Sequence, residues 1–291
     1  MEHLTRLDTL VAKVRRGLSP DERGEGHIEA ALVAMEAQSG EILAMVGGRE
    51  GQFNYASANR SPGSAIKPLV YLQAIAEGSH RSEPFTAATI IDPKRDPVDN
   101  YRPSEHVGGP ATVRAMLARS DNGAAVVAAH DGGLDPVRDL IRRAAGSYSD
   151  HLTGMLALGG SAGSEVSVLK TAEAYSVFPN YGVKVSQTPF AAVYRDGVRV
   201  DLPRCRPERI TDAAPTYVMT QMMRSVLKPG GTASGALSLA GLPGSSEIGG
   251  KTGTGMVSDL WFVGFSRRKS SRKASTRSCA RSAIAAVSAV R

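Results

Sequence analysis

Cysteine, aromatic residues and long apolar runs are scarce in this sequence. Only Cys205 and Cys279 occur in 291 residues, so we expect neither a disulfide framework nor a cysteine metal site. The six histidines form no His-Glu-x-x-His or related spacing. The sequence contains no run of about 18 apolar residues and no hydrophobic signal segment at its start. We therefore expect no metal, no cofactor and, for the chain as written, neither membrane insertion nor export.

The positive charge of the chain is concentrated at one end. The net charge of +7 at first suggests nucleic acid or a membrane surface as a partner. Residues 266–291, however, hold eight of the 35 basic residues and no acidic residue, which leaves 27 basic against 28 acidic residues in the rest of the chain. The body of the protein is thus electrically ordinary, and we expect no nucleic-acid partner.

Three short motifs follow one another along the chain. They are Ser64-Ala65-Ile66-Lys67, Ser120-Asp121-Asn122 and Lys251-Thr252-Gly253-Thr254. Each motif alone is weak evidence for a catalytic site. Ser-x-x-Lys, for example, occurs five times in the sequence. The first of them also follows a Pro-Gly turn and precedes an apolar run at residues 69–75, which predicts a helix that begins at the serine. A lysine three residues later then lies on the same helix face as the serine.

These residue types suit acyl transfer through a serine. Ser64 would be the nucleophile, and it needs a neighbouring base to remove its proton. Lys67 can be that base if burial and a nearby positive charge lower its pKa. Ser120 could relay a proton to a leaving amine, and Asn122 could hold Lys67 and a substrate amide. We therefore predict that these four residues are catalytic.

The last motif is expected to bind the substrate. Lys251 supplies the positive charge, and the hydroxyl groups of Thr252 and Thr254 would help it to hold a substrate carboxylate. The backbone N–H groups of Ser64 and Thr254 are candidates for an oxyanion hole. With Gly253 between the two threonines, residues 251–254 form the predicted binding strand.

The pattern of elements predicts an α/β (α+β) fold in three parts. Residues 1–26 read as an amphipathic helix (4–18) and a polar linker, and residues 28–36 and 41–46 as a β-hairpin. Helical patterns dominate residues 64–179, with a helix expected at 164–178. Strands are expected at 246–254 and 260–265. Residues 27–265 would be the folded domain, and 266–291 a basic low-complexity tail.

The sequence resembles a known family, the transpeptidase domain of class A (bifunctional) penicillin-binding proteins. The matching stretches are SGEILAMVGG (39–48), RSPGSAIKP (60–68), ARSDN (118–122), LALGG (156–160), GGKTGT (249–254) and WFVGF (261–265). The resemblance implies a fold like that of serine β-lactamases and D,D-transpeptidases, with an antiparallel sheet flanked by helices and a helical subdomain. It also implies cross-linking of peptidoglycan stem peptides that end in D-Ala-D-Ala, covalent binding of β-lactams, and a place in the cell envelope. Attachment to a membrane would need an anchor supplied by a longer parent chain.

The sequence departs from the family pattern after residue 265. The family continues into an apolar strand that lies centrally in the sheet, whereas residues 267–273 here are mostly Arg, Lys and Ser. We therefore expect this strand to be missing, residues 267–281 to be exposed and mobile, and the domain to be only marginally stable. For part of residues 282–290 two alternatives stay open, a helix or a weak strand that folds back, since Ile284, Val287 and Val290 are apolar.

Two other functions stay open. A serine β-lactamase would be expected to carry a Glu-x-x-x-Asn between Ser120 and Lys251, but the only such spacing runs from Glu50 to Asn54, ahead of the nucleophile. This favours a long-lived acyl-enzyme over rapid hydrolysis. The other alternative is a truncated, non-catalytic module that only recognises penicillin.

Overall fold

The computed structural model describes most of the chain between residues 29 and 290. The described ranges are 29–48, 52–78, 84–95, 101–105, 107–146, 148–190, 192–200, 206–244, 247–255, 259–267 and 282–290. The helix and linker expected in residues 1–26, and the basic stretch at 268–281, lie outside them. No helix in the described ranges is long and apolar enough to cross a membrane.

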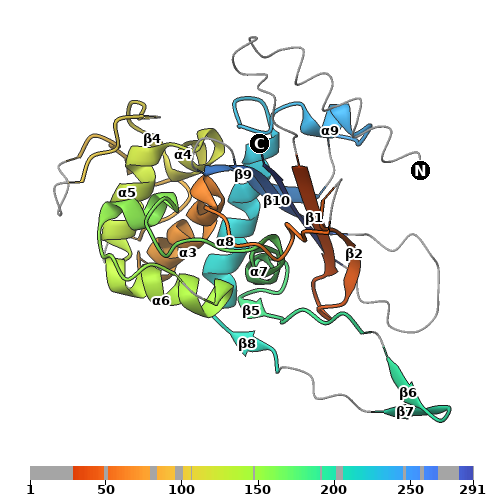
Figure 1. Ribbon diagram of the computed structural model, residues 1–291. Coiled ribbons are helices and arrows are strands. Elements are labelled where there is room, and N and C mark those ends of the chain that lie inside the picture. The colour runs from red at the N-terminus through yellow and green to blue at the C-terminus, as the bar shows by residue number, and fades with distance from the viewer. Residues whose placement is uncertain are drawn as a thin grey trace.

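A five-stranded antiparallel sheet forms one layer of the structure, in the order β2-β1-β11-β10-β9 (Figure 1). Its strands are β1 (Glu29–Glu36), β2 (Ile42–Val46), β9 (Ile248–Gly255), β10 (Asp259–Arg267) and β11 (Ser282–Val290). Buried and half-buried residues alternate strictly along β1, with Ala31, Val33 and Met35 turned into the core. The predicted hairpin and the two later strands are confirmed.

The expectation that the central strand is missing is wrong. Strand β11, which lies inside the predicted tail, pairs with β1 on one side and β10 on the other. Its register runs from Glu29↔Val290 to Glu36↔Ala283, and from Leu260↔Ala289 to Arg267↔Ser282. The physical reason is local composition: residues 282–290 are all Ser, Ala, Ile or Val, and the basic residues of the tail lie outside them. The sheet therefore extends past residue 265, while the boundary at residues 26 and 27 stays a prediction.

Helices cover the sheet and build a second lobe. They are α3 (Lys67–Gly78), α4 (Val113–Arg119), α5 (Asn122–Asp131), α6 (Leu134–Ala145), α7 (Val168–Tyr175), α8 (Ala213–Met223) and α9 (Ala236–Leu239), with 3₁₀ turns η1 (Gly63–Ile66), η2 (Gly154–Leu158) and η3 (Arg224–Leu227). Figure 1 shows α3 to α6 gathered away from the sheet, with α7 and α8 between them and the strands. The expected α/β fold with a helical subdomain is thus observed. The helix expected at 164–178 begins only after Ser167, whose side chain accepts a hydrogen bond from Lys170 N and caps α7.

Three short strand pairs lie outside the main sheet. They are β3 (Ile90–Ile91) with β4 (Ala111–Thr112), β5 (Val183–Lys184) with β8 (Glu208–Arg209), and β6 (Val193–Arg195) with β7 (Val198–Val200). In Figure 1 the β6–β7 hairpin projects away from the rest of the molecule.

The main hydrophobic core joins the sheet to the helices around α3. Leu69, Val70 and Leu72 of α3 are fully buried, and they belong to the same cluster as Val33 of β1 and Val263 of β10. This core fixes the position of the first turn of α3 relative to the sheet, which is where the predicted nucleophile lies.

Candidate active site

Ser64 lies in a 3₁₀ turn that leads directly into α3. Gly63, just before it, has φ +49°, and a Cβ there would come within 2.0 Å of the Thr254 carbonyl oxygen. Only glycine therefore allows this turn to lie against β9. Ser64 itself is half-buried. The predicted turn followed by a helix is confirmed, although its first turn is 3₁₀ rather than α-helical.

Lys67 is fully buried and bound by the second motif. Its Nζ donates to Asn122 Oδ1 (2.6 Å), to the Ser120 carbonyl oxygen (2.7 Å), to the Asp121 carbonyl oxygen (3.3 Å) and, at 3.4 Å, to Ser120 Oγ. None of these bonds goes to Ser64. Burial lowers the pKa of Lys67 from 10.5 to about 7, against the opposing charge of Asp121. A lysine with a pKa near neutrality can be a proton acceptor.

Ser120 holds a strained backbone conformation at the centre of the site. Its φ of 62° and ψ of 36° are left-handed, at the C-cap of α4. Such a conformation is unfavourable for a residue with a Cβ, although it is common at helix C-termini. Here it aims Ser120 Oγ at both lysines: Lys251 Nζ donates to this oxygen at 2.8 Å, and Lys67 Nζ at 3.4 Å.

Lys251 comes from strand β9, on the other side of Ser120. Its side chain is fully buried, and its Nζ also donates to the Thr252 carbonyl oxygen at 2.9 Å. Burial and the charge of Lys67 lower the pKa of Lys251 well below 10.5. The two lysines therefore form a buried pair with a shared acceptor, and neither lies where solvent would stabilise its charge.

Strand β9 approaches the serine turn very closely because of Gly253. A Cβ at Gly253 would come within 2.5 Å of the Pro62 carbonyl oxygen and 2.7 Å of Ala65 N. Gly253 is therefore needed for the close approach of β9 to the serine turn, whereas its part in binding substrate stays a prediction. Trp261 of the adjacent strand β10 strengthens this contact, since its Nε1 donates to the Ser61 carbonyl oxygen at 2.8 Å.

The motifs meet at a cleft of about 520 Å³. Its lining residues are Ser64, Glu105, Arg119, Ser120, Asn122, Leu158, Thr232, Thr252, Gly253, Thr254, Leu260 and Trp261. Six of the predicted site residues are in this lining, and the other two, Lys67 and Lys251, are buried against Ser120 beneath it. The structure therefore brings all the predicted residues together, while their individual roles stay predictions.

The sequence motifs did not reveal how the loop formed by residues 101–105 and 107–109 is held beside the cleft. Asn122 Nδ2 donates to the Glu105 carbonyl oxygen at 3.0 Å, and Gly108 N donates to Asp121 Oδ2 at 2.8 Å. Arg119 Nη2 donates to the Gly109 carbonyl oxygen at 2.8 Å. The second motif thus fixes one wall of the cleft as well as Lys67. The loop sequence contains no motif that predicts these hydrogen bonds between side chains and the backbone. Only the tertiary structure shows them.

Thr232 is a second residue of the cleft that the sequence motifs did not predict. Its Oγ1 lies 2.6 Å from Thr252 Oγ1, at hydrogen-bond distance, so the two hydroxyl groups lie together in the lining of the cleft. Thr232 follows a Lys-Pro-Gly-Gly turn far from any motif, and no local pattern marks it as a site residue.

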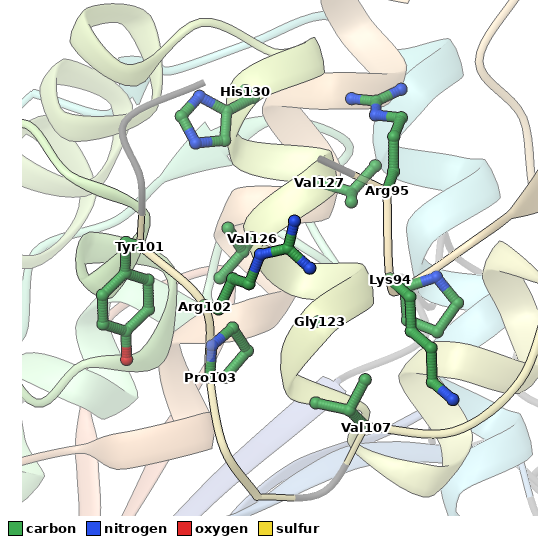
Figure 2. A pocket seen from close by; sticks show the side chains of 11 residues that line it. Lys94, Arg95, Tyr101, Arg102, Pro103, Val107, Gly123, Val126, Val127 and His130 are labelled. Carbon is green, nitrogen blue, oxygen red and sulfur yellow. The ribbon is translucent and has the colours of Figure 1, made fainter. Parts of the chain in front are cut away.

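A smaller cavity of about 140 Å³ is lined in part by residues of the same loop (Figure 2). Tyr101, Arg102 and Pro103 face it from the loop, and Val126 and Val127 face it from α5. Ser64 is not part of it. The loop therefore forms a shared wall, with Glu105 on the side of the cleft.

Comparison with known proteins agrees with this architecture. The family described as penicillin binding protein transpeptidase domain matches residues 30–274. Penicillin-binding protein 1A of Neisseria meningitidis (serogroup A) is 35% identical over 254 residues, which cover 82% of this chain and 31% of that protein. Penicillin-binding protein 1A of Aquifex aeolicus is 34% identical over 254 residues, covering 82% of this chain and 33% of that protein. The chain thus spans about a third of the length of these relatives.

Solved structures share the fold. Penicillin-binding protein 3 from Mycobacterium tuberculosis, complexed with aztreonam, superposes with a TM-score of 0.71 at 20% identity, over 90% of this chain and 66% of that one. Penicillin-binding protein 1A from Haemophilus influenzae gives a TM-score of 0.68 at 20% identity, over 90% of this chain and 43% of that one. The expected transpeptidase-like fold is therefore confirmed. With the family match covering most of the sequence, this chain belongs to the penicillin-binding protein transpeptidase domain family.

Proposed function

We propose that this domain is a D,D-transpeptidase that cross-links peptidoglycan stem peptides through an acyl-enzyme on Ser64. The observation that carries the proposal is the pair of buried lysines, Lys67 and Lys251, on either side of Ser120 Oγ at the start of the Ser64 helix. A buried cation pair of this kind is costly for stability. Its arrangement beside a nucleophile suits proton transfer, whereas a structural core has no need of it.

Binding of the substrate would give the two lysines different protonation states and therefore different roles. A peptide carboxylate bound beside Lys251, Thr252 and Thr232 stabilises the charged form of Lys251. That charge in turn disfavours a second positive charge on Lys67, so Lys67 becomes neutral and able to accept a proton. Because β9 is the edge strand of the sheet, its outer edge is available to a peptide that runs alongside as a further strand.

In the first step Ser64 Oγ attacks the carbonyl carbon of the penultimate D-Ala while Lys67 takes the hydroxyl proton. The bond from this carbon to the nitrogen of the terminal D-Ala breaks, and a proton passes through Ser120 to that nitrogen, so that D-Ala leaves as an amine. The backbone N–H groups of Ser64 and Thr254 would stabilise the oxyanion, each being worth about 2.7–4 kcal/mol in comparable sites.

In the second step the amine of a neighbouring stem peptide attacks the ester carbon. The new C–N bond forms, the bond to Ser64 Oγ breaks, and the proton lost by the amine returns to the serine oxygen through the same groups. If water takes the place of the amine, the reaction is that of a D-Ala-D-Ala carboxypeptidase. A β-lactam would acylate Ser64 in the same way and keep its leaving nitrogen tethered. These substrates belong to the cell envelope, which is where we propose that the protein acts.

Labelled benzylpenicillin tests the proposal. Intact mass spectrometry should find one adduct, located on the peptide that contains Ser64, and Ser64→Ala should lose it. An adduct that persists in Ser64→Ala would refute the assignment. Release of the label distinguishes the alternatives: slow release supports a transpeptidase, rapid release a serine β-lactamase, and no adduct at all a non-catalytic module.

The lysine roles can be separated with two variants. Lys67→Ala should lower the acylation rate by about 10²–10⁴-fold, because it removes the proton acceptor. Lys251→Ala should also weaken the initial capture of penicillin, which saturation kinetics report. An unchanged acylation rate in Lys67→Ala would show that another group is the base.

A further inference from the structure

The cleft contains one acidic residue among its lining residues, and that residue has no counter-charge. Glu105 is exposed, and its carboxylate makes no hydrogen bond or ion pair within the described part of the chain. The basic residue in the lining, Arg119, is engaged by Asp121 at 3.3 Å and by the Gly109 carbonyl oxygen at 2.8 Å. An exposed negative charge therefore belongs to the lining of a cleft beside which two lysines are buried.

The position of Glu105 is fixed although its side chain is exposed. Its carbonyl oxygen accepts the hydrogen bond from Asn122 Nδ2, and the other amide atom of Asn122, Oδ1, accepts from Lys67. Three residues further on, Gly108 N is bound by Asp121. The backbone that carries Glu105 is therefore tied to Asp121 and Asn122 at the start of α5, and Glu105 lines the cleft.

From this arrangement we propose that Glu105 is a specificity residue that binds an ammonium group of the peptide substrates. The proposal rests on the proposed function, which places a carboxylate at the lysine end of the cleft. A peptide with a carboxylate beside Lys251 and an ammonium group beside Glu105 would therefore be complementary in charge to both of these residues. The ammonium group can come from an amino side chain of the acyl donor or from the acceptor. In the second case the bound ammonium ion must release one proton to solvent before its nitrogen attacks the ester, and the experiment separates the two sources.

The donor arm compares two penicillins that differ by one ammonium group. Ampicillin carries an amino group on the side-chain carbon where benzylpenicillin has hydrogen. The second-order acylation rates of both are measured for the unmodified protein, for Glu105→Gln, and for Glu165→Gln, an exposed glutamate outside the cleft lining. If the donor supplies the cation, Glu105→Gln should lower the ampicillin-to-benzylpenicillin rate ratio about two- to fivefold, as for an exposed ion pair. Glu165→Gln should leave the ratio unchanged.

The acceptor arm uses a donor that has no free amine, Nα,Nε-diacetyl-Lys-D-Ala-D-Ala, with D-alanine amide as the acceptor. The partition of the acyl-enzyme between aminolysis and hydrolysis is measured in the same three proteins. If the acceptor supplies the cation, Glu105→Gln should shift this partition toward hydrolysis about two- to fivefold, and added salt should shrink the difference.

The outcomes are distinct. A change in either arm that is confined to Glu105→Gln supports the proposal and names the source of the cation. Unchanged ratios in both arms, with acylation of Ser64 intact, overturn it while leaving the proposed function standing. Absence of penicillin acylation in the unmodified protein would overturn the proposed function, and the role of Glu105 would fall with it.

Discussion

Lys67 and Lys251 share one hydrogen-bond acceptor, Ser120 Oγ, which lies 3.4 Å from the first Nζ and 2.8 Å from the second. Two ammonium groups this close repel each other, and both are withdrawn from water, so burial lowers the pKa of each. The pair therefore gives up one proton far more readily than two isolated lysines would. Four predictions follow from this geometry and from the strands and turns that build it.

The acylation rate should depend on pH through Lys67. Below its pKa of about 7 the lysine is protonated and cannot accept the serine proton, so the rate should fall up to about tenfold per pH unit as the solution is made more acidic. Above this pKa the rate should level off. Penicillin acylation followed from about pH 5.5 to 9 measures this profile, with circular dichroism at each pH to exclude unfolding. A rate independent of pH across this range would contradict the role of Lys67.

Two substitutions at Ser120 should differ in their effect on stability, because only one of them relieves the backbone strain, while both should lower activity. Ser120→Gly relieves the cost of the left-handed conformation, whereas Ser120→Ala keeps it, and both remove the hydroxyl that the two lysines share. We expect Ser120→Gly to be more stable than Ser120→Ala by about 1 kcal/mol in urea unfolding. Both variants should acylate more slowly than the unmodified protein. Equal stability of the two variants would mean that the left-handed conformation costs nothing here.

Gly253 should tolerate no side chain. In Gly253→Ala the new Cβ would meet backbone atoms at 2.5 and 2.7 Å, so β9 must move away from the Ser64 turn. We expect a loss of about 1–3 kcal/mol in stability and a marked fall in the acylation rate. Gly160→Ala is the matched control, since a Cβ there meets nothing within 4 Å. If both variants acylate at the rate of the unmodified protein, close approach of β9 is not required.

Strand β11 should be essential for the sheet. Val287 lies between Leu32 of β1 and Phe262 of β10, so Val287→Pro removes a donor and distorts a strand that is paired on both sides. We expect a lower melting temperature and loss of penicillin acylation together. Val198→Pro, in the separate β6–β7 pair, is the control and should leave acylation in place. Normal acylation in Val287→Pro would show that the site forms without β11.

The sequence predicted the parts of the site that short motifs define. Ser64, Ser120 and Lys251 each belong to a motif whose spacing places its residues on one turn or strand, and these segments converge in the fold. Thr232 and Glu105 could not be predicted, because their places in the cleft depend on contacts between segments distant in sequence. Neither residue belongs to a local pattern that a single sequence reveals.

The tail was misjudged for a different reason. Its charge, averaged over residues 266–291, outweighed the uncharged stretch at 282–290, for which the sequence indicated no more than a helix or a weak strand. The strand also had to be recognised some distance after Phe265, beyond the point where the apolar pattern of β10 ends. Pairing with β1 is a long-range event, and a pattern within one segment carries little information about it.

The place of β11 also bears on the order in which the protein assembles. The β1–β2 hairpin precedes the helices in the sequence, yet within the described residues it pairs with the rest of the sheet through β11, which follows all of them. During synthesis the helices that carry Lys67 and Ser120 can therefore form while the hairpin still lacks a neighbour, and long-range closure of this kind is slow. A nascent chain that has not yet exposed β11 should be unreactive to penicillin, so acylation would report the point at which β11 enters the sheet.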